Sequence, residues 1–223
     1  VAGMMAGCSS KPQENTAAAT ETETIAAETT AAETEAESKA EAKADLGEQS
    51  ILVAAAASLK NAYEDELIPM FEEQYPGVTV EGTYDSSGKL QTQIEEGLEA
   101  DVFMSAATKQ MKALDEEGMI ASDTIVNLLE NKIVLIVPTG SDSKIDSFEK
   151  IGDAASIALG DPESVPAGQY AKEALTNLNV WDSIQDKVSF GTNVTEVLNQ
   201  VAAASADAGI VYATDAASKA DQV

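Results

Sequence analysis

Apolar and polar residues alternate along residues 49–223 with two different periods. Short apolar runs predict strands, and longer stretches whose apolar residues recur every three or four positions predict helices. The expected strands are 51–55, 78–84, 101–104, 132–137, 156–159, 188–190 and 208–211. The expected helices are 59–75, 88–97, 108–117, 123–129, 167–178 and 194–204, and Pro69 should interrupt the first helix or open its second half. Because the two kinds of element alternate, the sequence predicts an α/β fold with a largely parallel sheet.

Residues 9–48 have a different composition from the rest of the chain. They are almost entirely Ala, Thr, Glu, Ser and Lys, with 10 acidic residues, 3 basic residues and no aromatic residue. Such a segment buries too little apolar surface to offset the entropy lost on ordering. We therefore expect a disordered acidic linker ahead of a globular part that begins near residue 49.

The charge of the chain excludes several classes of protein. Its 39 Asp and Glu face only 13 basic residues, all of them lysine, which gives a formal net charge of −26. So acidic a chain repels nucleic acid and anionic lipid, and an anionic ligand would have to be held by local dipoles. There is no histidine, so Ser-His and Cys-His dyads are excluded, and no phosphate-loop or Gly-x-Ser-x-Gly motif is present. We therefore expect a binding protein and no enzyme, with no catalytic residue.

Two serines stand where an expected strand gives way to an expected helix. Ser58 follows the run 51–57, and Ser87 follows the strand 78–84. At a helix N-cap, a hydroxyl lies beside unpaired backbone N–H groups and the positive end of the helix dipole. Each serine alone could be a plain cap without a ligand, whereas two such helix ends facing one point would form a cradle for an anion.

Five segments carry a resemblance to a known family. They are Ala55-Ala56-Ala57-Ser58-Leu59, Ser86-Ser87-Gly88-Lys89-Leu90, the run 100–106 (Ala-Asp-Val-Phe-Met-Ser-Ala), the run 160–175 beginning Gly-Asp-Pro and containing Val-Pro-Ala-Gly, and the run 208–216. In this order and spacing, the chain resembles the molybdate-binding component of bacterial ABC importers, within the type II periplasmic binding proteins. The Gly-Asp-Pro…Val-Pro-Ala-Gly segment is the most specific of the five.

The resemblance implies a fold and a division of the chain. The fold would be a two-lobed α/β periplasmic-binding-protein fold with the ligand cleft between the lobes. Lobe 1 would span 49–135, lobe 2 would span 136–210, and residues 211–223 would return to lobe 1. The family continues beyond this point, so lobe 1 is expected to be incomplete.

The resemblance also implies the residues that bind the ligand. Carried over position by position, Ser58 and Ser87 would contribute hydroxyls from lobe 1. The backbone N–H groups of Ala167 and Val194 would come from lobe 2, and the Tyr212 hydroxyl would complete the set. Molybdenum would be bound only as its oxyanion, molybdate or tungstate would be the ligand, and no cofactor is expected.

The N-terminal sequence indicates where in the cell such a protein would be found. Met5-Ala6-Gly7-Cys8 resembles a bacterial lipobox, in which the cysteine is lipidated, so residues 1–8 are interpreted as the remnant of a signal peptide. Cys8 would then anchor a monomer to the outer face of the cytoplasmic membrane through the linker 9–48. The expected partners are the oxyanion, the membrane and the transmembrane permease subunits, with no nucleic acid.

Two alternatives stay open at this point. The ligand could be another tetrahedral oxyanion: sulfate is a smaller dianion, and phosphate, which keeps a proton in part, usually needs a carboxylate acceptor. Asp85, Asp161 and Asp215 lie near the motifs and could supply that acceptor. The other alternative is a surface adhesin that has kept only the fold, because an adhesin has no need of the donors between the lobes.

Overall fold

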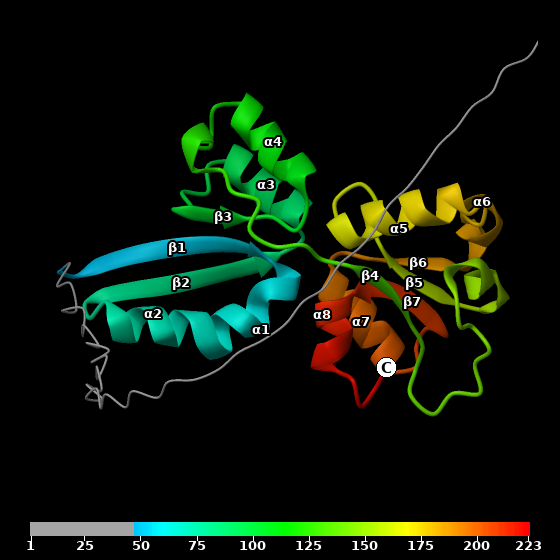
Figure 1. Cartoon of the computed structure of the whole chain (residues 1–223). Helices are drawn as coiled ribbons and strands as arrows, with labels where there is room; N and C mark the ends of the chain where they lie inside the picture. The colour runs from blue at the N-terminus through cyan, green and yellow to red at the C-terminus, as the bar shows by residue number, and fades with distance from the viewer. Residues whose placement is uncertain (1–46) are drawn as a thin grey trace, which may run out of the picture. The chain divides into compact units, whose positions relative to one another are not determined.

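The computed structural model describes residues 47–223 and contains two separate β-sheets (Figure 1). The predicted signal-peptide remnant with Cys8, and nearly all of the predicted linker, lie outside the described residues. The first sheet has the order β2-β1-β3, and both pairs of strands are parallel. Its strands are β1 (Gln49–Ala56), β2 (Val78–Asp85) and β3 (Val102–Met104).

The second sheet has the order β4-β7-β5-β6. Strand β5 runs parallel to β6 and β7, while β4 pairs with β7 in the antiparallel sense. Its strands are β4 (Ile133–Ile136), β5 (Ile157–Gly160), β6 (Val188–Gly191) and β7 (Ala208–Tyr212). The α/β fold with mostly parallel strands, expected from the alternating pattern, is thereby confirmed.

Helices follow most of the parallel strands. Those of the first lobe are α1 (Lys60–Ala62), α2 (Ile68–Gln74), α3 (Ser87–Glu95) and α4 (Thr108–Glu116). Those of the second lobe are α5 (Pro166–Asn177), α6 (Trp181–Ile184), α7 (Val194–Ala202) and α8 (Ala213–Ser218). A π-helical segment, Tyr63–Leu67, joins α1 to α2. Pro69 lies in the first turn of α2, directly after the π-helical segment, so the second half of the predicted helix begins beside this proline as expected.

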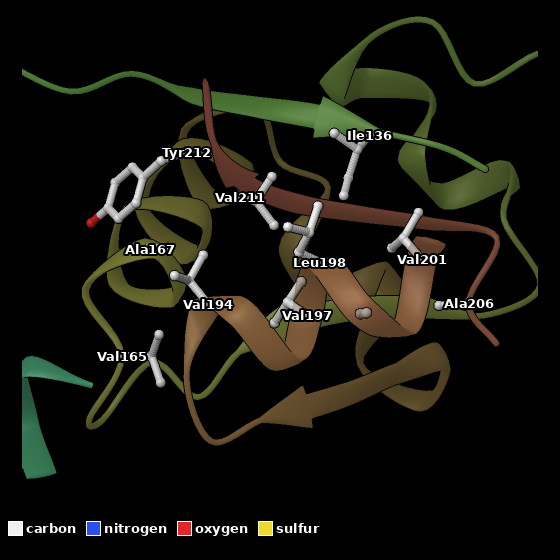
Figure 2. Close-up of a cluster of buried hydrophobic side chains, with 11 residues drawn as sticks. Ile136, Val165, Ala167, Val194, Val197, Leu198, Val201, Ala206, Val211 and Tyr212 are labelled. Carbon is white, nitrogen blue, oxygen red and sulfur yellow. The ribbon is translucent and has the colours of Figure 1, made fainter. Parts of the chain in front are cut away.

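Strand β7, in the interior of the second sheet, is covered on both faces. Successive residues of β7 point to opposite faces: Val211 belongs to a cluster with Leu198 and Val201 of α7, whereas Ile210 packs with Leu175 of α5 on the other face. Figure 2 shows the first of these clusters. A parallel strand covered on both faces needs apolar residues throughout, and all five residues of β7 are buried.

The predicted helix 123–129 is wrong. The structure has a short 3-10 turn at Ser122–Thr124, and residues 125–132 have no regular structure. Val126 and Leu129 are 72% and 76% exposed, so the apolar residues behind the prediction have no core to pack against. A helix of so few residues is not stable in water without such packing.

The boundary between the lobes also differs from the expected one. Strand β4, whose first residues were assigned to lobe 1, is hydrogen-bonded to β7 in the second sheet. Helix α8 contacts α7, β4 and β7, and Val223 packs against the buried cluster of α7. Residues 133–135 and 211–223 therefore lie with the second lobe, because the antiparallel pairing of β4 with β7 holds both segments there.

Within residues 47–223, no helix combines the length and the apolar content that crossing a bilayer requires.

Candidate functional site

The five residues predicted to bind a ligand line one pocket. Ser58, Ser87, Ala167, Val194 and Tyr212 all contribute to its wall. The other lining residues are Ala56, Ala57, Ser86, Ala106, Val165 and Pro166. The pocket is small: the space open to the centre of a water-sized group is about 10 Å³, roughly what a single water molecule needs.

The strand order explains why these residues meet. Ser58 follows β1, Ser87 follows β2, Ala106 follows β3 and Val194 follows β6, while Tyr212 is the last residue of β7. In open α/β sheets, ligands bind at the carboxyl ends of the parallel strands. The pocket is therefore built from the strand ends of both sheets.

The two serines do not cap helices as the sequence predicted. Ser58 lies inside a 3-10 turn, Ala57–Leu59, whose N-cap is Ala56. Ser87 is the first residue of α3, and the N-cap is Ser86, whose Oγ accepts a hydrogen bond of 3.4 Å from the backbone N–H of Lys89. In a Ser-Ser pair before a helix either residue can cap, and only the course of the backbone decides which one does.

Because Ser86 performs the capping, the hydroxyl of Ser87 is left for another role. Its Oγ accepts a hydrogen bond of 3.0 Å from the backbone N–H of Ala106. An oxygen that accepts this bond keeps its own hydrogen to donate. Ser87 is fully buried, so that donor belongs to the pocket wall and is screened from bulk water.

Ser86 and Ala106 line the pocket but were not predicted to bind. Ser86 stands next to a predicted residue, and Ala106 closes one of the five segments that carry the family resemblance. The serine doublet itself could have pointed to Ser86. Ala106 acts through its backbone, which no side-chain pattern reveals.

The beginning of α5 brings backbone donors to the pocket. Pro166 is the first residue of this helix and has no N–H, so Ala167 carries the first backbone donor. The first N–H groups of a helix have no partner within it. Helix α5 lies directly against β5: a Cβ on Gly168 would collide with the carbonyl group of Gly160. The missing side chain at Gly168 therefore lets the helix begin at the pocket.

The beginning of α7 is held in place by its own side chains. Asn193 is the N-cap, and its Oδ1 accepts a hydrogen bond of 3.0 Å from the backbone N–H of Glu196. The Glu196 carboxylate in turn accepts bonds of 2.7 Å and 2.9 Å from the N–H and the hydroxyl of Thr192. These two bonds, the backbone one first, lower the pKa of Glu196. Val194, the first residue of α7, is thereby fixed with its N–H among the unpaired donors of the helix end.

Tyr212 contributes a buried hydroxyl. The residue is 2% exposed, and its hydroxyl lies 3.5 Å from the carbonyl oxygen of Ala106. Burial raises the pKa of the phenol, so the group keeps its proton at neutral pH and remains a donor. At 3.5 Å the bond to Ala106 is long, which leaves the hydroxyl free to turn toward a better acceptor.

No charged side chain lines the pocket. Lys89, two residues after the lining residue Ser87, pairs with Asp85 at 3.4 Å. Within the described residues, no group of three or more Asp, Glu or Cys side chains is arranged to hold a bare metal cation. The wall offers four hydroxyls and several helix-terminal N–H groups, which is a set of neutral donors for an anion.

Each of the three aspartates named as possible acceptors accepts a hydrogen bond from a nearby backbone N–H. Asp85 accepts a bond of 2.8 Å from the N–H of Ser86 and pairs with Lys89, and Asp161 accepts one of 3.0 Å from the N–H of Glu163. Asp215 accepts one of 3.2 Å from the N–H of Tyr212. None of the three belongs to the pocket wall, so the wall lacks the carboxylate that a partly protonated phosphate would need.

Comparisons with known proteins show the family to which the chain belongs. The profile described as "Bacterial extracellular solute-binding protein" matches residues 51–223. Bacillus subtilis has a "Putative ABC transporter substrate-binding lipoprotein YvgL" that is 44% identical over 167 residues, covering 75% of this chain and 64% of that protein. The "Molybdate-binding protein ModA" of Haemophilus influenzae is 40% identical over 172 residues, covering 74% of this chain and 67% of that protein. This chain thus spans about two thirds of the length of the curated relatives that it matches.

A solved structure shares both the sequence and the fold. It is described as the "substrate binding domain of putative molybdenum ABC transporter from Clostridium difficile" and is 42% identical to this chain. The match covers 75% of this chain and 73% of that one, with a TM-score of 0.55. The two-lobed α/β fold is that of the type II periplasmic binding proteins. The chain belongs to the family of bacterial extracellular solute-binding proteins.

Proposed function

We propose that this protein is the substrate-binding component of an ABC importer and that it captures molybdate or tungstate. One observation carries the proposal: the pocket at the strand ends of both sheets is lined by neutral donors, with no charged side chain. Relatives at 44% and 40% identity carry names that refer to ABC transport and to molybdate binding. Donors without acceptors suit a dianion that holds no proton.

The proposed ligand contacts come from both lobes. The hydroxyls of Ser58, Ser87 and Tyr212 would each donate one hydrogen bond to an oxyanion oxygen. The backbone N–H groups of Ala167 and Val194 would donate two more, with the dipoles of α5 and α7 directed at the anion. Molybdenum would then be held only through its oxygens, and no cofactor would be needed.

Other ligands are the second choice. Sulfate matches molybdate in charge and differs in size, so it has to be compared by measurement. Phosphate is disfavoured because the pocket wall has no carboxylate. A surface adhesin with only the fold retained is disfavoured because it would have no need for this set of buried donors.

We further propose that the protein is a monomer held at the outer face of the cytoplasmic membrane by a lipid on Cys8. The family is one of extracellular solute-binding proteins, and the Bacillus subtilis relative is named as a lipoprotein. From there the protein would deliver its ligand to the transmembrane permease subunits. Incorporation of labelled palmitate into the parent protein, and its loss in Cys8→Ala, would test the anchor.

The ligand is tested by calorimetric titration with molybdate, tungstate, sulfate and phosphate. We expect tight binding of molybdate or tungstate by the parent protein. Ser58→Ala and Ser87→Ala should each weaken it about 10- to 100-fold, because each removes one hydrogen bond to a charged group. Ser189→Ala, on the exposed part of β6, is the matched control and should bind as the parent does.

Two results would contradict the proposal. If the protein bound phosphate and none of the other anions, its ligand would be phosphate and not molybdate or tungstate. If Ser87→Ala bound molybdate as tightly as the parent, the ligand would not bind in this pocket. Circular dichroism of each variant shows whether a loss of binding arises from a loss of structure.

A further inference from the structure

Helix α3 touches the loop before α5 through backbone atoms. The N–H of Gly88 donates a hydrogen bond of 3.0 Å to the carbonyl oxygen of Ser164. Gly88 belongs to the first lobe, where α3 contacts β1, β2 and α4. Ser164 lies between β5 and α5 of the second lobe. The bond therefore links the two lobes directly.

There is no room for a side chain at Gly88. A Cβ there would lie 2.5 Å from the carbonyl oxygen of Ser164, 2.8 Å from its Cα and 3.0 Å from its carbonyl carbon. All three are backbone atoms, so no side-chain rotation can relieve the clash. Gly88 does not adopt a positive φ, which means that glycine is needed here for space and not for backbone conformation.

This contact lies beside donors on both sides of the pocket. Gly88 directly follows Ser86 and Ser87 in the chain, and Ser164 directly precedes the lining residues Val165, Pro166 and Ala167. The separation of Gly88 and Ser164 therefore sets the distance between the hydroxyl of Ser87 and the N–H of Ala167.

A second contact between the lobes involves Ala106, which also binds Ser87. The Tyr212 hydroxyl faces the carbonyl oxygen of Ala106, and the N–H of Ala106 donates to Ser87 Oγ. Ser87 is thus placed by a contact on each side, one at the neighbouring Gly88 and one at Ala106. A shift of the first lobe away from Ser164 would therefore separate the Ser87 hydroxyl from the donors of the second lobe, the Ala167 N–H and the Tyr212 hydroxyl.

We propose that Gly88 is a positioning residue: the absence of its side chain lets the lobes approach closely enough for the donors of both to reach one oxyanion. This inference rests on the proposed function, because the affinity that it explains is affinity for an oxyanion. Gly88 itself is not counted among the ligand donors.

The test is Gly88→Ala, which separates affinity from stability. Alanine is a better helix former than glycine, so α3 itself should not be weakened by the change. We expect the affinity for molybdate to fall at least tenfold in calorimetric titration, while the melting temperature of the ligand-free protein is not lowered. A residue that only supported the fold would lose stability together with affinity.

Gly152→Ala is the matched control. A Cβ at Gly152 would meet only the Cγ2 of Ile184, at 3.7 Å, which is an ordinary van der Waals contact. This variant should bind molybdate as tightly as the parent. Small-angle scattering of the ligand-free proteins adds a readout that needs no ligand, and we expect a larger radius of gyration for Gly88→Ala than for the parent and Gly152→Ala.

The outcomes distinguish the two proposals. If the parent binds molybdate and Gly88→Ala binds it equally well, the role of Gly88 is overturned and the proposed function stands. If the parent binds none of the four anions, the proposed function fails and scattering alone decides, with identical curves overturning the role of Gly88. A Gly88→Ala protein that does not fold would also overturn it, because the contact would then be part of the folding core.

Discussion

Asp215 is a buried carboxyl group in the first turn of α8, next to the tyrosine of the pocket. It is 6% exposed, and its Oδ2 accepts the backbone N–H of Tyr212 at 3.2 Å. Burial raises its pKa from 3.8 to about 6, and the hydrogen bond from Tyr212 offsets only part of that rise. The folded state therefore binds this proton more tightly than the unfolded chain does.

The buried carboxyl group of Asp215 makes the stability of the folded protein depend on pH. A raised pKa in the folded state gives stability that is fully present below pH 3.8 and is lost as the pH rises to about 6. Asp215→Asn removes the buried charge and keeps an oxygen to accept from Tyr212. We expect this variant to be more stable than the parent by about 2–3 kcal/mol at pH 7.5, with the difference vanishing near pH 4.

Urea denaturation at several pH values measures this difference. Asp123→Asn, at an exposed position in the turn Ser122–Thr124, is the control and should follow the parent at every pH. A variant at Asp215 that is less stable than the parent at pH 7.5 would mean that the charged hydrogen bond to Tyr212 outweighs the cost of burial.

At the scale of elements, the beginning of α7 connects stability with the pocket. Asn193 caps this helix by accepting the backbone N–H of Glu196. Val194, which directly follows Asn193, lines the pocket. Asn193→Ala should lower the free energy of unfolding by about 1 kcal/mol, the usual effect of losing an N-cap side chain. It should also weaken molybdate binding, because the first turn of the helix then holds its N–H groups less firmly.

The control for this variant is Asn131→Ala. Asn131 also accepts a backbone N–H, that of Lys132 at 2.8 Å, but it is exposed and lies outside the pocket wall. Denaturation midpoints and calorimetric titration of both variants give the comparison. If Asn193→Ala matched the parent in both measurements, the cap would have no role in placing Val194.

At the scale of the whole molecule, the pocket wall is shared by the two lobes, so a bound ligand should stabilise their contact. Molybdate at 100 times its dissociation constant should add about 2.7 kcal/mol to the stability. For a chain of this size that corresponds to a rise in melting temperature of about 5–10 °C. Chloride at matched ionic strength is the control, and an equal rise with chloride would assign the effect to salt.

The strands and helices of this protein are predictable from sequence where their packing is complete. The helices 167–178 and 194–204 were expected and are present as α5 (Pro166–Asn177) and α7 (Val194–Ala202), since both bury an apolar face against the second sheet. The helix 123–129 was expected on similar evidence and is absent, because its apolar residues contact no core. A periodic pattern shows which face can be buried, and it does not reveal whether another element covers that face.

For the candidate site, the sequence alone determined the residue types and their order along the chain. It predicted Ser58, Ser87, Ala167, Val194 and Tyr212, and these five line one pocket. Only the tertiary structure decided that Ser86 caps α3 in place of Ser87, and that backbone atoms of Ala106 and Gly88 contact the second lobe. The physical reason is that turns, caps and donor groups depend on residues close together in the sequence. Contacts between backbone atoms that are distant in the chain depend on how the strands pair.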